Sequence, residues 1–241
     1  MSSRSRLSYD IAIEDTGRTF NLQLSDPSDI VADNLALATW GSSQVLANLL
    51  HRLDVAKSIS QAQSHDIPVL ELGAGTGLVG ISAAAIWRTS AVLTDLTPIL
   101  PAIEANADLN RQVVSKLGGR VECGLLDWAQ PETLKVTAGD KRTLLANVNK
   151  ARIVLAADTM YSEEHPELLT TAISAWLARD RDARVVLCYP LRIGYLDHIR
   201  DMWSRFEEAG LVSIEEGREA IDQSWDEDVP YEWVVWKWRL V

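Results

Sequence analysis

The segment that most constrains the fold is 69–78, VLELGAGTGL, in which a short apolar run is followed by closely spaced glycines. Gly73, Gly75 and Gly77 alternate with other residues, and from Leu78 onward apolar residues recur at helical spacing. Glycine adopts positive φ easily and lets a ligand approach the backbone. The first turn of the following helix presents unpaired N–H groups and the positive end of its dipole. We therefore predict a strand, a ligand-binding loop and a helix.

This loop matches two ligand-binding patterns. Residues 75–80 (GTGLVG) fit the dinucleotide fingerprint G-x-G-x-x-G, with Asp95 at about the right later position. The first glycine after the strand is Gly73, however, and the pattern read from there includes Glu71, whose carboxylate would repel a pyrophosphate. S-adenosylmethionine instead offers an ammonium to Glu71, directly or through water, and two ribose hydroxyls to Asp95. The pattern favours S-adenosylmethionine over a dinucleotide, with a purely structural glycine turn as the remaining alternative.

Strand-like apolar runs alternate with helical patterns over most of the chain after residue 68. The predicted strands are 69–72, 91–94, 121–125, 153–157 and 183–189, the predicted helices are 77–87, 98–117, 166–178 and 195–209, and a final hairpin pairs 211–215 with 233–240. This alternation predicts a doubly wound, mostly parallel sheet, whose ligands lie beyond the carboxyl ends of the strands. Four strands end close to an acid, Glu71, Asp95, Asp127 or Asp158, which suits one cationic, hydroxyl-rich ligand. Residues 129–150 are predicted to be polar and irregular.

The N-terminal part is predicted to be an extension of this sheet domain. Alternating apolar residues between Tyr9 and Leu24, around a turn at 15–18, predict a β-hairpin. A helix is predicted over about 42–53, followed by a loop or helix tail at 54–66. We therefore divide the chain into an N-terminal extension, 1–36, and a main domain, 37–241.

The composition limits the classes of partner. The chain has 241 residues, a net charge of −11 and a pI of about 4.8. Nucleic-acid surfaces normally show a basic stripe, so we predict no nucleic-acid partner. The acidic stretch 215–228 is either a solvated loop or a surface that meets a basic substrate. No apolar run is long enough for a membrane span, and the first residues predict no secretory signal. Cys123 and Cys188 are predicted to be buried free thiols, which indicates the cytoplasm or nucleus.

Three motifs together carry a resemblance to a known family. They are ELGAGTG at 71–77, TWGSS at 39–43 and DTMY at 158–161. With them the chain resembles the class I, seven-stranded S-adenosylmethionine-dependent methyltransferases, which have a Rossmann-like fold. Within that class it is similar to the family-16 type protein-lysine methyltransferases, whose members modify translation elongation factors, chaperones and related proteins. The likeness runs from about residue 37 to the end of the chain.

The resemblance implies a set of cofactor-binding residues. They are Trp40, Glu71, Gly73, Ala74, Gly75, Asp95, Leu96, Asp127, Trp128 and Ala157. In this family the glycine segment approaches the methionine part, and Asp95 would hold the ribose with Leu96 beside it. Asp127 and Trp128 would flank the adenine, and Trp40 would pack beside the cofactor. Core or rim packing remains an alternative for the two tryptophans, and helix capping for Asp95.

The resemblance also implies that Asp158 and Tyr161 line a lysine channel. Methyl transfer needs an aligned, neutral amine, so Asp158 would orient the amine or take its proton, and Tyr161 would fix it. The alternatives are that Asp158 caps a helix and that Tyr161 packs at its start. No His/Cys cluster with metal-ligand spacing is present in the sequence, and no metal is predicted.

The leading interpretation is a protein-lysine N-methyltransferase acting on a translation elongation factor or a similar cytosolic protein. It would use S-adenosyl-L-methionine, release S-adenosyl-L-homocysteine, and act as a monomer without nucleic acid or membrane. The alternatives are a methyltransferase for small molecules or other protein residues, and a catalytically silent cofactor-binding partner protein.

Overall fold

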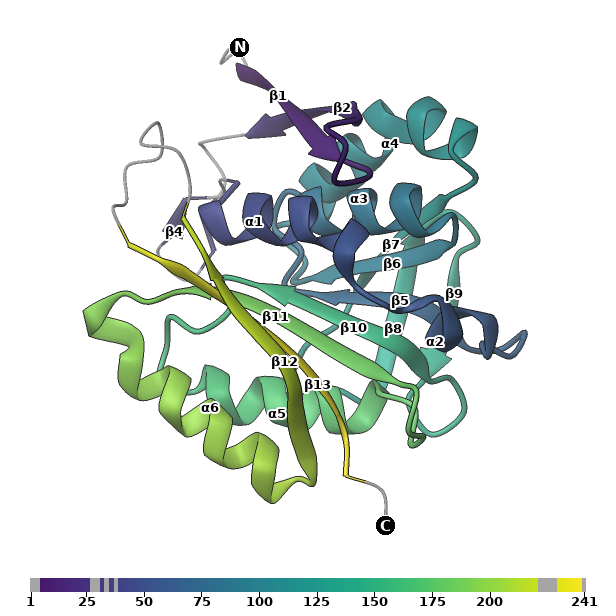
Figure 1. The fold of residues 1–241 in the computed structure, drawn as a ribbon. Coiled ribbons are helices and arrows are strands. Elements are labelled where there is room, and N and C mark those ends of the chain that lie inside the picture. Colours follow the sequence, from purple (N-terminus) through teal and green to yellow (C-terminus); the bar gives the residue numbers. More distant parts are fainter. Residues whose placement is uncertain (1–4, 27–30, 33–34, 37–38, 221–228, 240–241) are drawn as a thin grey trace.

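The computed structural model of the chain describes residues 5–26, 31–32, 35–36, 39–220 and 229–239. Its centre is a nine-stranded sheet with helices on both faces (Figure 1). In chain order the strands are β5 (Ile67–Leu72), β6 (Ser90–Asp95), β7 (Arg120–Leu125), β8 (Thr133–Ala138), β9 (Arg142–Leu145), β10 (Ala151–Ala157), β11 (Arg184–Pro190), β12 (Leu211–Glu219) and β13 (Tyr231–Trp238). Across the sheet they lie in the order β12-β13-β11-β10-β5-β6-β7-β8-β9.

The five central strands, β7, β6, β5, β10 and β11, pair in parallel, so their carboxyl ends lie along one edge of the sheet. β13 is antiparallel to β11 and to β12. This is the doubly wound, mostly parallel sheet that the sequence predicts, with its seven predicted strands present and in place. Residues 221–228 of the acidic stretch lie outside the described part of the chain.

Helices cover both faces of the sheet. On one face lie α1 (Gly41–Leu49), α3 (Leu78–Trp87) and α4 (Leu100–Lys116), and on the other α5 (His165–Trp176) and α6 (Leu196–Glu208) (Figure 1). Alternate strand residues enter the two cores, because successive side chains of a strand point to opposite faces. Val69 packs in the core under α1 and α3, and Leu70 in the core under α5 and α6. Short helices lie in the connections, namely η1 (Leu50–Arg52), α2 (Ala56–Ser60) and η2 (Ile193–Tyr195).

The prediction that residues 129–150 are irregular is wrong, because β8 and β9 extend the sheet antiparallel to β7. Leu134 and Val136 are buried while Lys135 between them is exposed, the alternation expected of a half-buried strand. Both carboxylate oxygens of Glu122 on β7 accept bonds of 2.9 Å from the Arg142 guanidinium on β9. With two buried apolar residues in β8 and one in β9, the apolar pattern was too weak to predict these strands.

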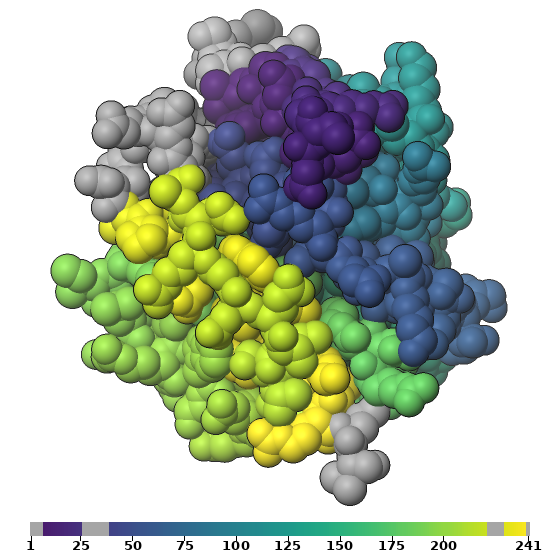
Figure 2. Space-filling model, in the orientation of Figure 1, coloured from purple at the N-terminus to yellow at the C-terminus, as the bar shows by residue number. Residues whose placement is uncertain are grey.

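The predicted N-terminal hairpin is present as β1 (Ser5–Ala12) and β2 (Thr19–Asp26), a separate two-stranded sheet. Figure 2 shows it (purple) seated against the segment that carries α1 (blue). Ile11 and Leu22 are fully buried and belong to the same core cluster as α1 and α3. The backbone also forms the short pair β3 (Val31–Ala32) and β4 (Leu35–Ala36). The extension therefore shares the core of the main domain.

Two buried asparagines of α4 bind the edge of β2. The Asn110 amide donates to Gln23 O at 2.7 Å and accepts from Gln23 N at 3.0 Å. Asn106 accepts from Ser25 N at 2.9 Å, and its Nδ2 donates to Ser25 O at 3.3 Å and to Thr76 O at 2.9 Å. The side-chain amides thus pair with β2 as a neighbouring strand would, and one of them reaches the glycine loop.

Replacing Asn110 with leucine is expected to destabilise the protein by about 3 kcal/mol, because a backbone N–H and a carbonyl at Gln23 would be left unpaired. Urea unfolding followed by circular dichroism measures this. Asp108→Asn, on the exposed side of the same helix, is the control and should change stability by less than about 0.5 kcal/mol. Equal unfolding midpoints for the two variants would contradict the role given to Asn110.

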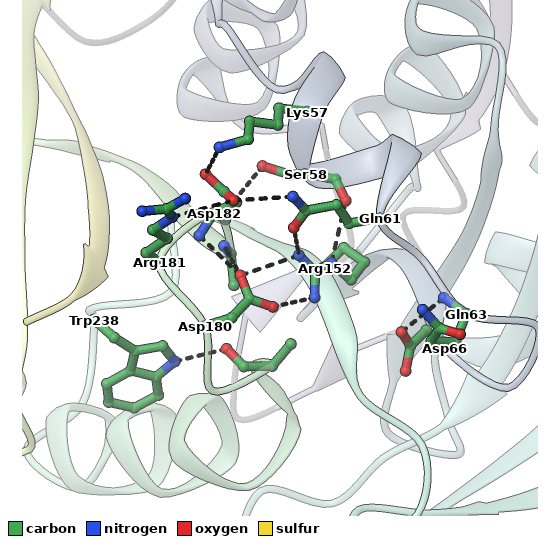
Figure 3. A network of polar contacts seen from close by, with 12 residues as sticks. Lys57, Ser58, Gln61, Gln63, Asp66, Arg152, Asp180, Arg181, Asp182 and Trp238 are labelled. Atoms are coloured by element: carbon green, nitrogen blue, oxygen red, sulfur yellow. Dashed lines mark hydrogen bonds and ion pairs between the residues drawn. The ribbon is translucent and has the colours of Figure 1, made fainter. Parts of the chain in front are cut away.

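A polar network joins α2 to the amino end of β10 (Figure 3). The Arg152 side chain is buried, and its guanidinium donates to Ser58 O at 3.1 Å and to Gln61 Oε1 at 3.0 Å. It also forms an ion pair with Asp180. Buried charges need such complete pairing, and we assign this network a structural role.

Cys123 and Cys188 are buried and form no disulfide, as predicted. Burial raises the pKa of the Cys123 thiol to about 12. Within the described residues no helix is long and apolar enough to cross a bilayer, and no group of three or more His, Cys, Asp or Glu side chains could hold a metal ion.

Candidate active site

The glycine loop connects β5 to α3 as the sequence predicts. Gly73, Gly75 and Gly77 have φ values of +65°, +56° and +86°, a region that strains other residues. A Cβ added at Gly73 would lie 3.2 Å from both Trp128 Cζ2 and Thr159 Cγ2. The loop backbone therefore lies directly beside the Trp128 indole, because Gly73 has no side chain to separate the two.

Glu71, at the end of β5, is buried, and its Oε2 accepts the Gly80 N–H at 2.9 Å. A Cβ on Gly80 would lie 2.4 Å from that oxygen, so any other residue at position 80 would clash with the Glu71 carboxylate. Burial raises the pKa of Glu71 to about 8, although the Gly80 hydrogen bond opposes the rise and nearby Asp95 adds to it. Glu71 thus holds the first turn of α3, and its contact with a ligand ammonium stays a prediction.

Asp95, at the end of β6, joins the loops that follow β5 and β6. Its Oδ2 accepts the Gly75 N–H at 2.9 Å and its Oδ1 accepts the Leu96 N–H at 2.8 Å. An ionised carboxylate has about four acceptor positions, so these two N–H groups do not exhaust what it can accept. Asp95 does not cap α4, because that helix begins at Leu100 after Ile99. Leu96 is 37 % exposed beside it.

An aromatic row lies beyond the ends of β7 and β10. The Trp128 and His165 rings meet edge to face at 5.8 Å between centroids, and Tyr161 and His165 do so at 4.3 Å. Asp127, next to Trp128, accepts the Ala129 N–H at 2.9 Å. Sequence reasoning gave His165 no role, and because Tyr161 precedes α5, helical spacing did not indicate their contact.

Asp158 follows β10 and has a positive φ of 57°, which is uncommon outside glycine. The Arg192 guanidinium donates to both of its carboxylate oxygens, at 3.0 Å and 3.4 Å, and Ser42 Oγ donates to Oδ2 at 3.3 Å. Arg192 also lies 5.7 Å from the centre of the Trp40 ring. Asp158 is not a helix cap, since Glu164 precedes α5. Sequence reasoning assigned no role to Arg192 and named Ser42 only within the TWGSS motif, because both reach Asp158 from distant segments.

The remaining predicted residues also lie at the carboxyl ends of the parallel strands. Ala157 is the last residue of β10, and the Ala74 carbonyl accepts the Gly77 N–H at 2.8 Å within the glycine turn. Trp40 is 37 % exposed, so it is not a core residue. Because β10, β5, β6 and β7 are parallel neighbours, their ends bring together the predicted cofactor and catalytic residues.

These residues fit S-adenosyl-L-methionine. A carboxylate at the strand end suits a ribose diol, and a glycine backbone beside an indole suits a flat, partly cationic ligand. Fold and site together define the class as a Rossmann-like S-adenosylmethionine-dependent methyltransferase.

The sequence profile of the family described as "Lysine methyltransferase" matches residues 21–201. The chain belongs to this family, as its motifs predicted, and S-adenosyl-L-methionine is the cofactor that follows from this membership.

Two curated relatives are protein-lysine N-methyltransferases, in agreement with the family match. The chain is 33 % identical over 210 residues to the protein-lysine N-methyltransferase EFM2 of Saccharomyces cerevisiae, covering 81 % of this chain and 46 % of that protein. It is 32 % identical over 210 residues to the protein-lysine N-methyltransferase rrg1 of Schizosaccharomyces pombe, covering 86 % and 64 %. The chain therefore spans about half to two thirds of the length of these relatives.

Solved structures support the fold. An O-methyltransferase family 2 protein from Planctomyces limnophilus superposes with a TM-score of 0.53 and 11 % identity, over 82 % of this chain and 56 % of that one. A SAM-dependent methyltransferase from Methanosarcina mazei gives a TM-score of 0.50 at 11 % identity, over 78 % and 100 %.

Proposed function

We propose that this protein is an S-adenosylmethionine-dependent protein-lysine N-methyltransferase whose substrate is a translation elongation factor or a similar cytosolic protein. The observation that carries the proposal is the position of Asp158. It directly follows β10, the strand that pairs with β5 before the glycine loop, and it has a positive φ and partners from two other segments. Family membership and the two yeast relatives support the reaction class.

The cofactor residues would act through backbone and carboxylate groups. Gly73 and Gly75 would let the methionine part approach the loop, Asp95 would accept hydrogen bonds from the ribose, and Trp128 would lie against the adenine. Asp127 would lie near the adenine amine. When bound, S-adenosyl-L-methionine supplies a methyl group on a sulfonium, which already carries the charge of a good leaving group.

The chain's own task at the acceptor side is to hold a neutral lysine amine in line. Asp158 would accept a hydrogen bond from the amine and so orient it. The Tyr161 ring would offer apolar surface to the lysine stem, which disfavours the charged ammonium, and Trp40 would pack beside the cofactor. The proton would leave to solvent before transfer.

The test is to incubate the protein with S-adenosyl-L-methionine and purified elongation factors, with a cell lysate in parallel. We expect intact-mass spectrometry to show added methyl groups on one protein, and peptide mapping to place them on lysine. Label confined to small metabolites would favour the small-molecule alternative. Cofactor binding by calorimetry with no transfer to any acceptor would favour the silent partner protein.

A further inference from the structure

We propose that Arg192 is a positioning residue that neutralises Asp158 by ion pairing, so that the site takes up the acceptor lysine as an uncharged amine. The inference rests on the proposed function and assigns a role to a residue that the family motifs do not include. It begins from the pairing of Arg192 with both oxygens of the Asp158 carboxylate.

The ion pair is well shielded from water. The Asp158 side chain is 6 % exposed and that of Arg192 is 20 % exposed. Exposed ion pairs are weak because water screens them, whereas a shielded, two-pronged arginine–carboxylate pair is strong and geometrically defined. The negative charge of Asp158 is therefore already compensated by Arg192 when a lysine approaches.

Both partners are fixed by other contacts. The Asp158 N–H donates to Cys188 O at 2.9 Å, which links its backbone to β11. Arg192 lies 5.7 Å from the ring centres of both Trp40 and Tyr195, within the range of cation–π attraction. The Tyr195 N–H also donates to Arg192 O at 2.9 Å, which closes a turn around the arginine. The guanidinium is thus held beside Asp158 rather than extended into solvent.

The chemical consequence concerns the protonation of the substrate. An ammonium has no free electron pair with which to attack a methyl group. A bare carboxylate beside it would stabilise the ammonium and raise the pKa of the lysine by about one to three units. With Arg192 in place the Asp158 carboxylate can still orient the amine, but it attracts the proton on that amine much less.

Ser42 and Cys188, which also hydrogen-bond to Asp158, do not supply a positive charge. Ser42, from α1, is uncharged. Cys188, from β11, is buried, and its pKa is raised well above the ordinary value by that burial and then by the charges of Asp158 and Glu219. Tyr161 and His165 face each other on the segment that leads into α5. The positive charge that pairs with the carboxylate is therefore assigned to Arg192.

The test compares Arg192→Gln and Arg192→Lys with the wild type across a range of pH, on the methylated protein substrate. For Arg192→Gln we expect the acid limb of kcat to move up by about one pH unit, with KM for the protein unchanged or lower. Arg192→Lys keeps a positive charge, so its profile should stay close to that of the wild type. Arg200→Gln, an exposed arginine on α6, is the matched control and should leave the profile unchanged.

Thermal melting and cofactor calorimetry establish that each variant is folded. An equal loss of kcat at every pH in Arg192→Gln, or a profile that does not move, would overturn the inference while leaving the proposed function in place. If Arg192→Gln does not fold, a shifted profile in Arg192→Lys would overturn it as well, since the charge is retained. A wild-type protein that methylates no lysine at any pH would overturn the proposed function, and this inference with it.

Discussion

Replacing Asp158 with asparagine is expected to lower kcat at least about a hundredfold, while changing the affinity for S-adenosyl-L-methionine less than about twofold. Asparagine also tolerates the positive φ found here, so the backbone should keep its place. What is lost is a charged acceptor that can hold both the Arg192 guanidinium and the acceptor amine. Single-turnover kinetics measures the transfer step, and calorimetry measures cofactor binding.

The control for this variant is Asp197→Asn, whose carboxylate is almost fully exposed on α6 and pairs with Arg200. It should retain wild-type kinetics. Wild-type turnover in Asp158→Asn would show that this carboxylate does not act on the acceptor, and a loss of cofactor binding would show that it belongs to the cofactor site instead.

Replacing Glu71 with glutamine is expected to stabilise the ligand-free protein at pH 8.5 by up to roughly 5 kcal/mol. Burial raises the pKa of Glu71 from its ordinary 4.5 to about 8. Between these values the unfolded chain releases a proton that the folded protein keeps, so stability falls as the pH rises from about 4.5 to 8. Glutamine removes this loss, and its amide oxygen can still accept the Gly80 N–H.

Urea unfolding at several pH values between 5 and 9 measures the effect. As the pH rises across this range, the free energy of unfolding of the wild type should fall relative to that of Glu71→Gln. Near pH 5 the difference between the two proteins should be small. Glu207→Gln, at an exposed position of α6, should follow the wild-type curve. Parallel curves for Glu71→Gln and the wild type would mean that Glu71 is ionised in the folded protein. We also expect Glu71→Gln to bind the cofactor more weakly, because a bound ammonium would favour the ionised form of Glu71, whereas glutamine cannot ionise.

The parts of the site that sequence reasoning predicted are those encoded by local chain geometry. Glycines at alternate positions after an apolar run require a tight loop with positive φ, and Gly73, Gly75 and Gly77 all adopt it. Acids at the ends of parallel strands must lie at one edge, whatever the details of packing. The shared edge on which Asp95 and Asp158 lie therefore follows from the order of strands and helices along the chain.

The parts that were missed depend on contacts between distant segments. Arg192 lies 34 residues after Asp158, and only the parallel pairing of β10 with β11 brings the two together. His165 contacts Trp128 because β10 and β7 end at the same side of the sheet, although the two residues lie far apart in the sequence. The antiparallel strands β8 and β9 were missed because half-exposed strands bury few residues and so resemble a loop in sequence.

The Asn106 side chain has a consequence for the first two strands. Its single amide nitrogen is shared between Ser25 O on β2 and Thr76 O in the glycine loop. A displacement of the hairpin would therefore be transmitted to the glycine loop, and a ligand held by that loop would in turn restrict the hairpin. The hairpin and the glycine loop are thus coupled through one side-chain amide of α4.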